Sequence, residues 1–169
     1  MVFIDETGLH TKMARRYGRR LKSPRCVGHV PHGHWQTSTF IAALRAESIT
    51  APFLIEGAVN AEVFTAYLQA VLCPELPPGE VVILDNLSTH KIPSVAELIA
   101  ARGASVRYLP PDSPDLNPIE MAFAKLKAQL RQAAARTLAD LQGSVAQSLR
   151  TFSPAHGQGF FRPAQYASI

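Results

Sequence analysis

The sequence predicts a mixed α/β fold in which one sheet is flanked by helices. Three short runs rich in β-branched and aromatic residues come first, and segments that alternate between helix and strand follow them. Hydrophobic residues make up 47% of the 169-residue chain and charged residues only 18%, which is the balance of a chain with a buried core and not of a disordered one. An antiparallel start joined to parallel crossovers accounts for this order of elements.

The first three predicted strands are short apolar segments. VFID at residues 2–5 is expected to be buried, and the runs at 35–44 and 49–56 are β-branched and aromatic. Pro52 favours an edge position for the third strand. Residues 12–34 are polar, basic and marked by glycine and proline, which indicates a loop or an irregular hairpin.

Helix and strand then alternate. A helix is expected to begin after Asn60, a suitable N-cap, and to stop at Pro74. EVVILD at 80–85 predicts a buried strand, residues 93–102 predict a helix and residues 105–109 predict a further strand.

Two helices complete the predicted fold. One begins at Pro118 and the other near Thr137, whereas residues 153–169 are expected to form an irregular tail. The resulting order is three strands, helix, strand, helix, strand and two helices. This order matches a ribonuclease-H-like fold, which is expected to occupy residues 1–152.

Two aspartates each end a predicted strand. Asp5 closes the first strand and Asp85 closes the strand at 80–85, and ligands gather at the carboxyl ends of parallel strands. If the strands are neighbours, their backbones lie roughly 4.8 Å apart, so the carboxylates repel each other unless a cation or a proton lies between them. Mg²⁺ or Mn²⁺ suits such oxygen ligands. Each aspartate alone is also explained as a turn cap. Glu6 points to the opposite face of the strand and is left out of this site.

Glu120 is the third acidic candidate. It follows Asp85 after 34 intervening residues, 86–119, which hold one helix, one strand and a loop. Asn117 and Glu120 also have the spacing of a capping box with Pro118 at the first helical position, and this explains Glu120 without a metal. A capping box does not exclude metal binding, because the carboxylate of Glu120 can still face the site.

Three motifs in order, FIDETG, ILDNLSTHK and LPPDSPDLNPIEMAFAKLK, together resemble the catalytic domain of a bacterial insertion-sequence transposase of the Tc/mariner superfamily. That superfamily has an Asp-Asp-Glu triad with 34 residues in its last interval. The resemblance implies that Asp5, Asp85 and Glu120 are catalytic and bind two divalent ions, Mg²⁺ or Mn²⁺. Asn86 and His90 match the second motif as accessory residues. For His90, contact with the scissile phosphate and local hydrogen bonding at a helix entry both stay open.

The resemblance also implies the reaction. The expected enzyme is a DNA transposase that hydrolyses phosphodiester bonds at transposon ends and transfers the freed 3′-hydroxyl to target DNA. One metal ion would activate the attacking water or hydroxyl and the other would stabilise the leaving oxygen. Two other interpretations stay open: a catalytically inactive, DNA-binding remnant, and a ribonuclease-H-type nuclease that acts on RNA–DNA hybrids.

Basic residues form two clusters that indicate a polyanionic partner. The net charge is +4, and residues 12–25 contain no acid. Lys127 and Arg131 fall near Glu120 around a helix and suit a DNA backbone, although plain surface charge explains them as well. The expected DNA-binding residues are Lys12, Arg15, Arg16, Arg19, Arg20, Lys127 and Arg131.

The resemblance further predicts partners and location. Full transposases of this group carry an N-terminal helix-turn-helix region, and because this chain starts on the first catalytic strand, we expect that region to be absent and a separate helix-turn-helix polypeptide to be a candidate partner. Double-stranded DNA from transposon ends and target, and a second copy in a homodimer on DNA, are the other expected partners. The sequence shows neither a signal peptide nor a membrane span, so we expect a bacterial cytoplasmic protein that associates with the nucleoid when it is on DNA.

Overall fold

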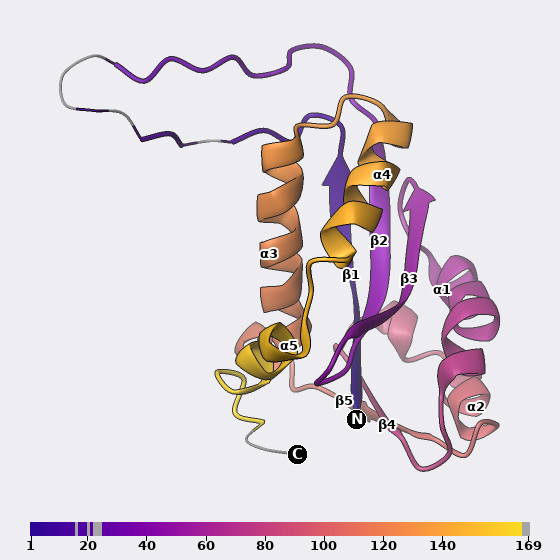
Figure 1. Cartoon of the computed structure of the whole chain (residues 1–169). Coiled ribbons are helices and arrows are strands. Elements are labelled where there is room, and N and C mark those ends of the chain that lie inside the picture. The colour runs from indigo at the N-terminus through magenta and orange to yellow at the C-terminus, as the bar shows by residue number, and fades with distance from the viewer. Residues whose placement is uncertain (16, 20, 22–24, 167–169) are drawn as a thin grey trace.

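A computed structural model describes residues 1–15, 17–19, 21 and 25–166 of the chain. Within these residues, five strands form one mixed sheet with helices on both faces, which confirms the predicted fold class (Figure 1). The strands are β1 (Val2–His10), β2 (Thr37–Leu44), β3 (Ile49–Glu56), β4 (Val81–Leu84) and β5 (Ser105–Tyr108). The α-helices are α1 (Ala61–Tyr67), α2 (Pro93–Ala100), α3 (Pro118–Ala133), α4 (Leu138–Leu149) and α5 (Pro154–Phe161). Short π or 3₁₀ turns are η1 (Leu68–Leu72), η2 (Cys73–Glu75), η3 (Ser88–His90) and η4 (Pro114–Leu116).

The strand order is β3-β2-β1-β4-β5, so β1 lies at the centre of the sheet. The first three strands pair antiparallel, whereas β4 and β5 run parallel to β1. This arrangement is the predicted antiparallel start joined to parallel crossovers, and it places the carboxyl end of β4 beside the middle of β1.

The central strand is longer than the sequence predicts. The apolar run ends at Asp5, but β1 continues to His10, because β2 pairs with it along this stretch, from Glu6 opposite Ile41 to His10 opposite Thr37. Antiparallel hydrogen bonds therefore extend β1 through residues whose own composition does not favour a buried strand.

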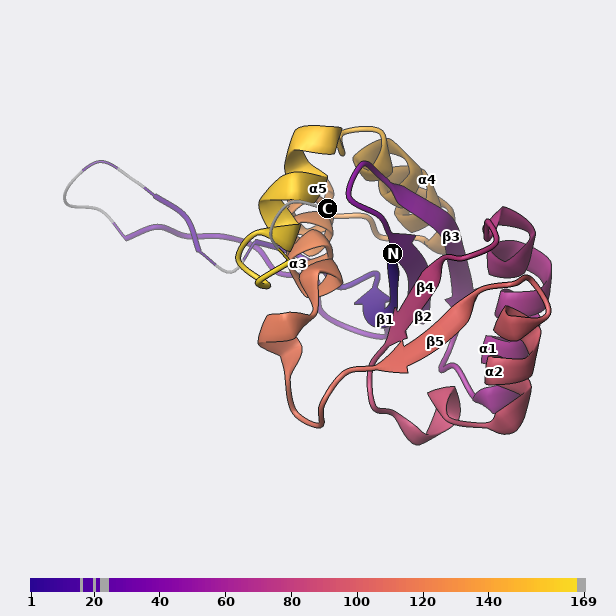
Figure 2. The same ribbon diagram turned by 90° about the horizontal axis from the view of Figure 1, so that it is seen from below.

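Side chains that alternate along the strands form two apolar layers, one on each face of the sheet. Phe3 and Phe40 pack on the face covered by α3, α4 and α5, where Phe123 lies 6.0 Å from Phe40 between ring centroids. Ile4 and Leu84 pack on the face covered by α1 and α2. Figure 2 shows these two groups of helices on opposite sides of the sheet. Among the residues that the structure describes, no helix combines the length and the apolar character needed to cross a membrane.

The C-terminal segment corrects one prediction. Residues 153–169 were expected to be an irregular tail, but Pro154–Phe161 form the helix α5, which begins with a capping box between Ser153 and His156. Gly157 and Gly159 weaken the helical pattern in the sequence. Gly157 nevertheless belongs there, because a Cβ at this position would overlap the backbone carbonyl of Ala46.

Candidate active site

The sheet register brings the two aspartates together. Ile4 and Leu84 form the last parallel pair between β1 and β4. Asp5 and Asp85, the residues that follow this pair, therefore lie next to each other. The predicted neighbourhood of these two strands is therefore confirmed. Both aspartates line a cavity of about 470 Å³, whose other wall comes from the proline-rich loop and the start of α3.

Asp5 is the most buried carboxylate of this cavity, with 6% of its surface exposed. Its Oδ1 accepts a hydrogen bond from the backbone N–H of Glu6 at 2.7 Å, and its Oδ2 accepts one from Nδ2 of Asn117 at 2.9 Å. Burial raises the pKa of Asp5 to about 7, against the opposing effect of the Glu6 N–H, and the charges of Glu120 and Asp85 also raise it. A cation placed among these carboxylates would relieve this repulsion.

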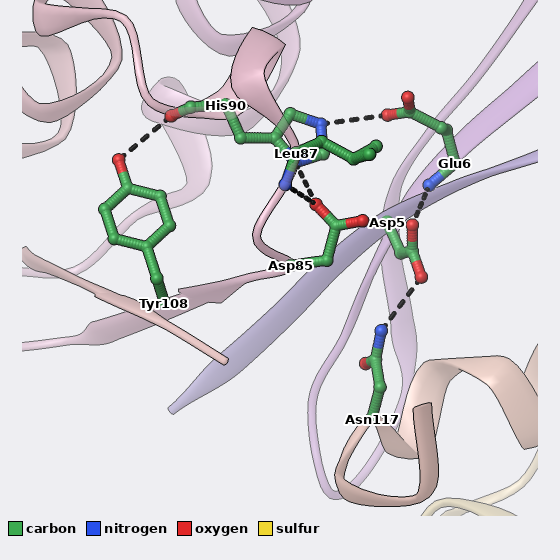
Figure 3. Close-up of polar contacts among 7 residues, drawn as sticks. All are labelled: Asp5, Glu6, Asp85, Leu87, His90, Tyr108 and Asn117. Carbon is green, nitrogen blue, oxygen red and sulfur yellow. Dashed lines mark hydrogen bonds and ion pairs between the residues drawn. The ribbon is translucent and has the colours of Figure 1, made fainter. Parts of the chain in front are cut away.

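Asp85 is held by one of its two oxygens. Its Oδ1 accepts hydrogen bonds from the backbone N–H of Leu87 at 3.1 Å and from Nδ1 of His90 at 2.5 Å. Burial acts to raise the pKa of Asp85, but these hydrogen bonds outweigh it and the pKa falls below its ordinary value. Figure 3 shows that the second oxygen points toward Asp5. Asp85 is therefore an ionised carboxylate with one oxygen directed into the site.

His90 connects the cavity to the helices behind it. Its ring is fully buried, lies 4.2 Å from the ring of Phe64 and bridges Asp85 to Oε2 of Glu6, which is 3.0 Å from Nε2 (Figure 3). Burial acts to lower the pKa of His90, but the two carboxylates raise it to about 9. The hydroxyl of Tyr108 donates to the backbone oxygen of His90 at 2.9 Å. Because both ring nitrogens are already bound, the geometry favours local hydrogen bonding over contact with a phosphate.

Glu6 corrects the predicted site. The residue points away from Asp5 across the strand, as expected, but it lines the same cavity and holds His90. Its role was missed because the contact joins residues 84 positions apart in the sequence. The acid that follows Asp5 in FIDETG was the only signal for it.

Glu120 and Asn86 both line the cavity, Glu120 from the first turn of α3 and Asn86 from the residue after Asp85. The capping box that explained Glu120 is not formed, because Asn117 makes no side-chain capping bond and is turned toward Asp5. As the described side chains stand, no three His, Cys, Asp or Glu residues are arranged closely enough to hold a metal ion. The cavity thus gathers all three predicted carboxylates without a closed ligand cage.

The predicted basic residues meet at the other end of α3. Lys12, Lys127 and Arg131 line one cavity of about 390 Å³, and Arg15 and Arg19 join Arg131 in a second of about 620 Å³. Figure 1 shows the described residues of the segment between β1 and β2, residues 11–36, extending away from the sheet near the C-terminal end of α3. The other two predicted contacts, Arg16 and Arg20, lie outside the residues that the structure describes.

The start of the segment between β1 and β2 is hydrogen-bonded to the residues that follow α3. Nη1 of Arg136 donates to the backbone oxygens of Thr11 and Met13 at 3.2 and 3.0 Å. Nζ of Lys12 lies 4.4 Å from the ring centre of Trp35. The bonds from Arg136 hold the backbone of Thr11 and Met13 close to the C-terminal end of α3.

Comparison with known proteins places this geometry in a family. A family model described as DDE superfamily endonuclease matches residues 1–142. Among curated proteins, no sequence matches the chain significantly.

Solved structures share the fold at low sequence identity. A Mos1 transposase paired-end complex with the left transposon end superposes with a TM-score of 0.75 at 15% identity, over 98% of this chain and 52% of that one. The Mos1 strand transfer complex gives 0.71 at 15% identity with the same coverage, 98% and 52%. The catalytic domain of Mos1 mariner transposase gives 0.68 at 13%, over 98% of this chain and 78% of that one. The chain thus spans about half the length of the Mos1 chains in the two complexes. Because the family model covers most of its length, the chain belongs to the DDE superfamily endonuclease family.

Proposed function

We propose that the chain is the catalytic domain of a DNA transposase, which cuts phosphodiester bonds at transposon ends and transfers the cut strand to target DNA. The observation that carries this proposal is the cavity that gathers Asp5, Asp85 and Glu120 from three separate elements. The family membership supports an endonuclease, and the similar Mos1 structures include a strand transfer complex.

Divalent metal ions fit this cavity by the chemistry of its side chains. Three carboxylates offer the hard oxygen ligands that Mg²⁺ and Mn²⁺ prefer. Burial, and to a smaller extent the charges of Glu120 and Asp85, raise the pKa of Asp5 above its ordinary value. Similar Mos1 paired-end complexes were solved with Mn and with Mg. We assign Asp5, Asp85 and Glu120 as the residues that would hold two ions. When bound, such ions supply an activated water or hydroxyl and stabilise the leaving oxygen.

Hydrogen bonds within the protein fix the orientation of two of these carboxylates. The N–H of Glu6 and the amide of Asn117 fix both oxygens of Asp5. Leu87 and His90 fix one oxygen of Asp85 and leave the other directed at Asp5. Asn86 stays in the proposal as an accessory residue at the cavity wall.

The basic residues around the C-terminal half of α3 form the proposed DNA track. Lys127 and Arg131 lie on the helix that begins at the acidic cavity, so a phosphate backbone that follows α3 would lead from Arg131 toward Glu120. Arg15, Arg19 and Lys12 would extend this contact, and Arg16 and Arg20 remain predicted contacts. Transposon-end and target duplexes, a second copy of the chain on DNA and a separate helix-turn-helix polypeptide are the proposed partners. A bacterial insertion-sequence origin and nucleoid-associated action in the cytoplasm belong to the same proposal.

A nicking assay distinguishes this function from its two alternatives. The protein is incubated with Mg²⁺ or Mn²⁺ and either duplex DNA or an RNA–DNA hybrid. We expect metal-dependent nicks in duplex DNA. Cleavage restricted to the hybrid would indicate a ribonuclease-H-type enzyme, and DNA binding without any cleavage would indicate an inactive remnant.

A further inference from the structure

Asn117 stands at the N-cap of α3 but does not cap it. Its Nδ2 donates to Oδ2 of Asp5 at 2.9 Å, and it makes no side-chain bond to the first turn of the helix (Figure 3). Asn60 at the N-cap of α1 behaves as the sequence predicts, since its side chain accepts from the N–H of Val63 at 2.9 Å. The same residue type at the same helical position is thus used in two different ways.

The orientation of Asn117 is costly for the helix. Only 4% of the residue is exposed, and its Oδ1 is buried without a hydrogen-bond partner. With the side chain turned toward α3, this oxygen would be in the usual N-cap position, where it accepts from a backbone N–H of the first turn and stabilises the helix. A buried polar atom without a partner is unfavourable, so the contact with Asp5 must offset both losses.

The contact has two geometric consequences for the acidic cavity. First, the Asn117 amide and the Glu6 N–H together occupy one position on each oxygen of Asp5, so the carboxylate cannot rotate freely. Second, Asn117 lies one turn before Glu120, and the bond spans 112 residues of sequence to join the start of α3 to β1. One side chain therefore fixes the orientation of the first carboxylate and the place from which the third one projects.

We propose that Asn117 is a positioning residue, which orients Asp5 and holds the start of α3 against β1 so that the carboxylates can bind divalent metal. This inference rests on the proposed function of the cavity. Substitution of a residue that hydrogen-bonds a metal ligand typically weakens metal affinity by about 10–100-fold. Substitution of a residue that only caps a helix lowers stability and leaves the metal affinity unchanged.

The test compares the two asparagines in the full chain. Binding of Mn²⁺ is measured by electron paramagnetic resonance for the wild type, Asn117→Ala, Asn117→Ser and the matched control Asn60→Ala, and each melting temperature is recorded without metal. We expect both Asn117 variants to bind Mn²⁺ about tenfold or more weakly than the wild type. Asn60→Ala should melt at a lower temperature, because it loses a real cap, and should bind Mn²⁺ as the wild type does.

The serine variant keeps the test decisive if the alanine variant does not fold, because its hydroxyl can cap α3 but is too short to replace the amide at Asp5. A folded Asn117→Ser protein with wild-type Mn²⁺ affinity would overturn the positioning role and leave the proposed function intact. A wild-type protein that binds no Mn²⁺ would instead overturn the metal site itself, and this inference with it.

Discussion

Asp5 binds a proton more tightly in the folded protein than a free aspartate does. Burial raises its pKa from 3.8 to about 7, against the opposing hydrogen bond from Glu6 N–H, and nearby carboxylates raise it as well. Because the folded-state pKa exceeds the unfolded value, the fold is favoured while the proton is bound. This contribution is lost as the pH rises from about 4 to about 7.

Asp5→Asn should therefore remove part of the pH dependence of stability. In urea titrations, the wild type should lose stability relative to Asp5→Asn between about pH 4 and about pH 7.5, by a few kcal/mol at roughly 1.4 kcal/mol per pKa unit. His90 and Asp85 titrate in both proteins and largely cancel in the difference. Parallel stability profiles for the two proteins would show that Asp5 is not the group with the raised pKa.

The ring of His90 offers a second test, because each of its nitrogens serves a different carboxylate. His90→Asn keeps an amide near the Nδ1 position and so preserves the contact with Asp85, whereas His90→Gln reaches toward Glu6 and leaves Asp85 without this donor. Both variants should be less stable, since the packing of the ring against Phe64 is removed.

If His90 acts by orienting Asp85, His90→Asn should show a Mn²⁺-dependent nicking rate about tenfold or more above that of His90→Gln, after correction for the folded fraction. A faster His90→Gln would assign the function of the ring to its contact with Glu6, and equal rates for the two variants would contradict a role in orienting Asp85.

At the scale of the elements, substitutions of two glycines in α5 test how closely this helix packs against the loop after β2. Gly157→Ala places a methyl group against the Ala46 carbonyl, whereas Gly159 has open space around its Cβ position in the same helix. Gly157→Ala should cost about 1–3 kcal/mol of unfolding free energy, as overpacking does. Gly159→Ala should gain about 0.5–1 kcal/mol, since alanine is the better helix former. Urea titration of both variants checks this, and a neutral Gly157→Ala would mean that α5 does not dock on the loop after β2.

The salt dependence of DNA binding tests whether α3 and the segment between β1 and β2 contact DNA together. When a substitution removes a cation that neutralises a phosphate of duplex DNA, the slope of log K against log salt should become shallower by about 0.9. Lys127→Gln, Arg131→Gln and Arg19→Gln should each show this reduction on any DNA sequence. Arg102→Gln, just beyond α2 on the other side of the sheet, is the control and should keep the wild-type slope. A slope that none of the three variants changes would exclude this surface as the DNA track.

An element can be predicted from the sequence when its own residues determine it, and cannot when it depends on contacts with distant residues. The strand VVIL is one apolar run and the start of α1 follows from Asn60, so both were predicted. The last five residues of β1 depend on pairing with β2, which lies far along the chain, and α5 depends on a close approach of Gly157 to Ala46. Neither cause leaves a pattern within its own segment.

At the scale of the whole molecule, some residues of the candidate site could likewise be predicted from local patterns, and others depend on contacts with distant residues. Asp5 ends the apolar run of β1, Asp85 directly follows the apolar strand β4, and Glu120 lies in the first turn of an amphipathic helix, so their convergence could be predicted from topology. The roles of Glu6 and Asn117 could not, because each is defined by a contact with a residue more than 80 positions away. For Asn117, the local rule for helix caps predicted the wrong partner.

The central claim is that three carboxylates from distant parts of the chain form one catalytic metal site, and Glu120→Gln tests it most directly. Without metal, the variant should melt within a few degrees of the wild type, because the missing charge–dipole interaction of about 0.3–1 kcal/mol is offset by reduced repulsion on Asp5. The matched control is Glu97→Gln, an exposed glutamate on α2.

The measurement is the rate of Mn²⁺-dependent nicking of duplex DNA by the wild type, Glu120→Gln and Glu97→Gln, with the melting temperature of each protein recorded with and without Mn²⁺. We predict that Glu120→Gln nicks about 100-fold or more slowly and loses most of the metal-induced rise in melting temperature, while Glu97→Gln behaves as the wild type. A Glu120→Gln protein that nicks DNA at the wild-type rate would contradict the account.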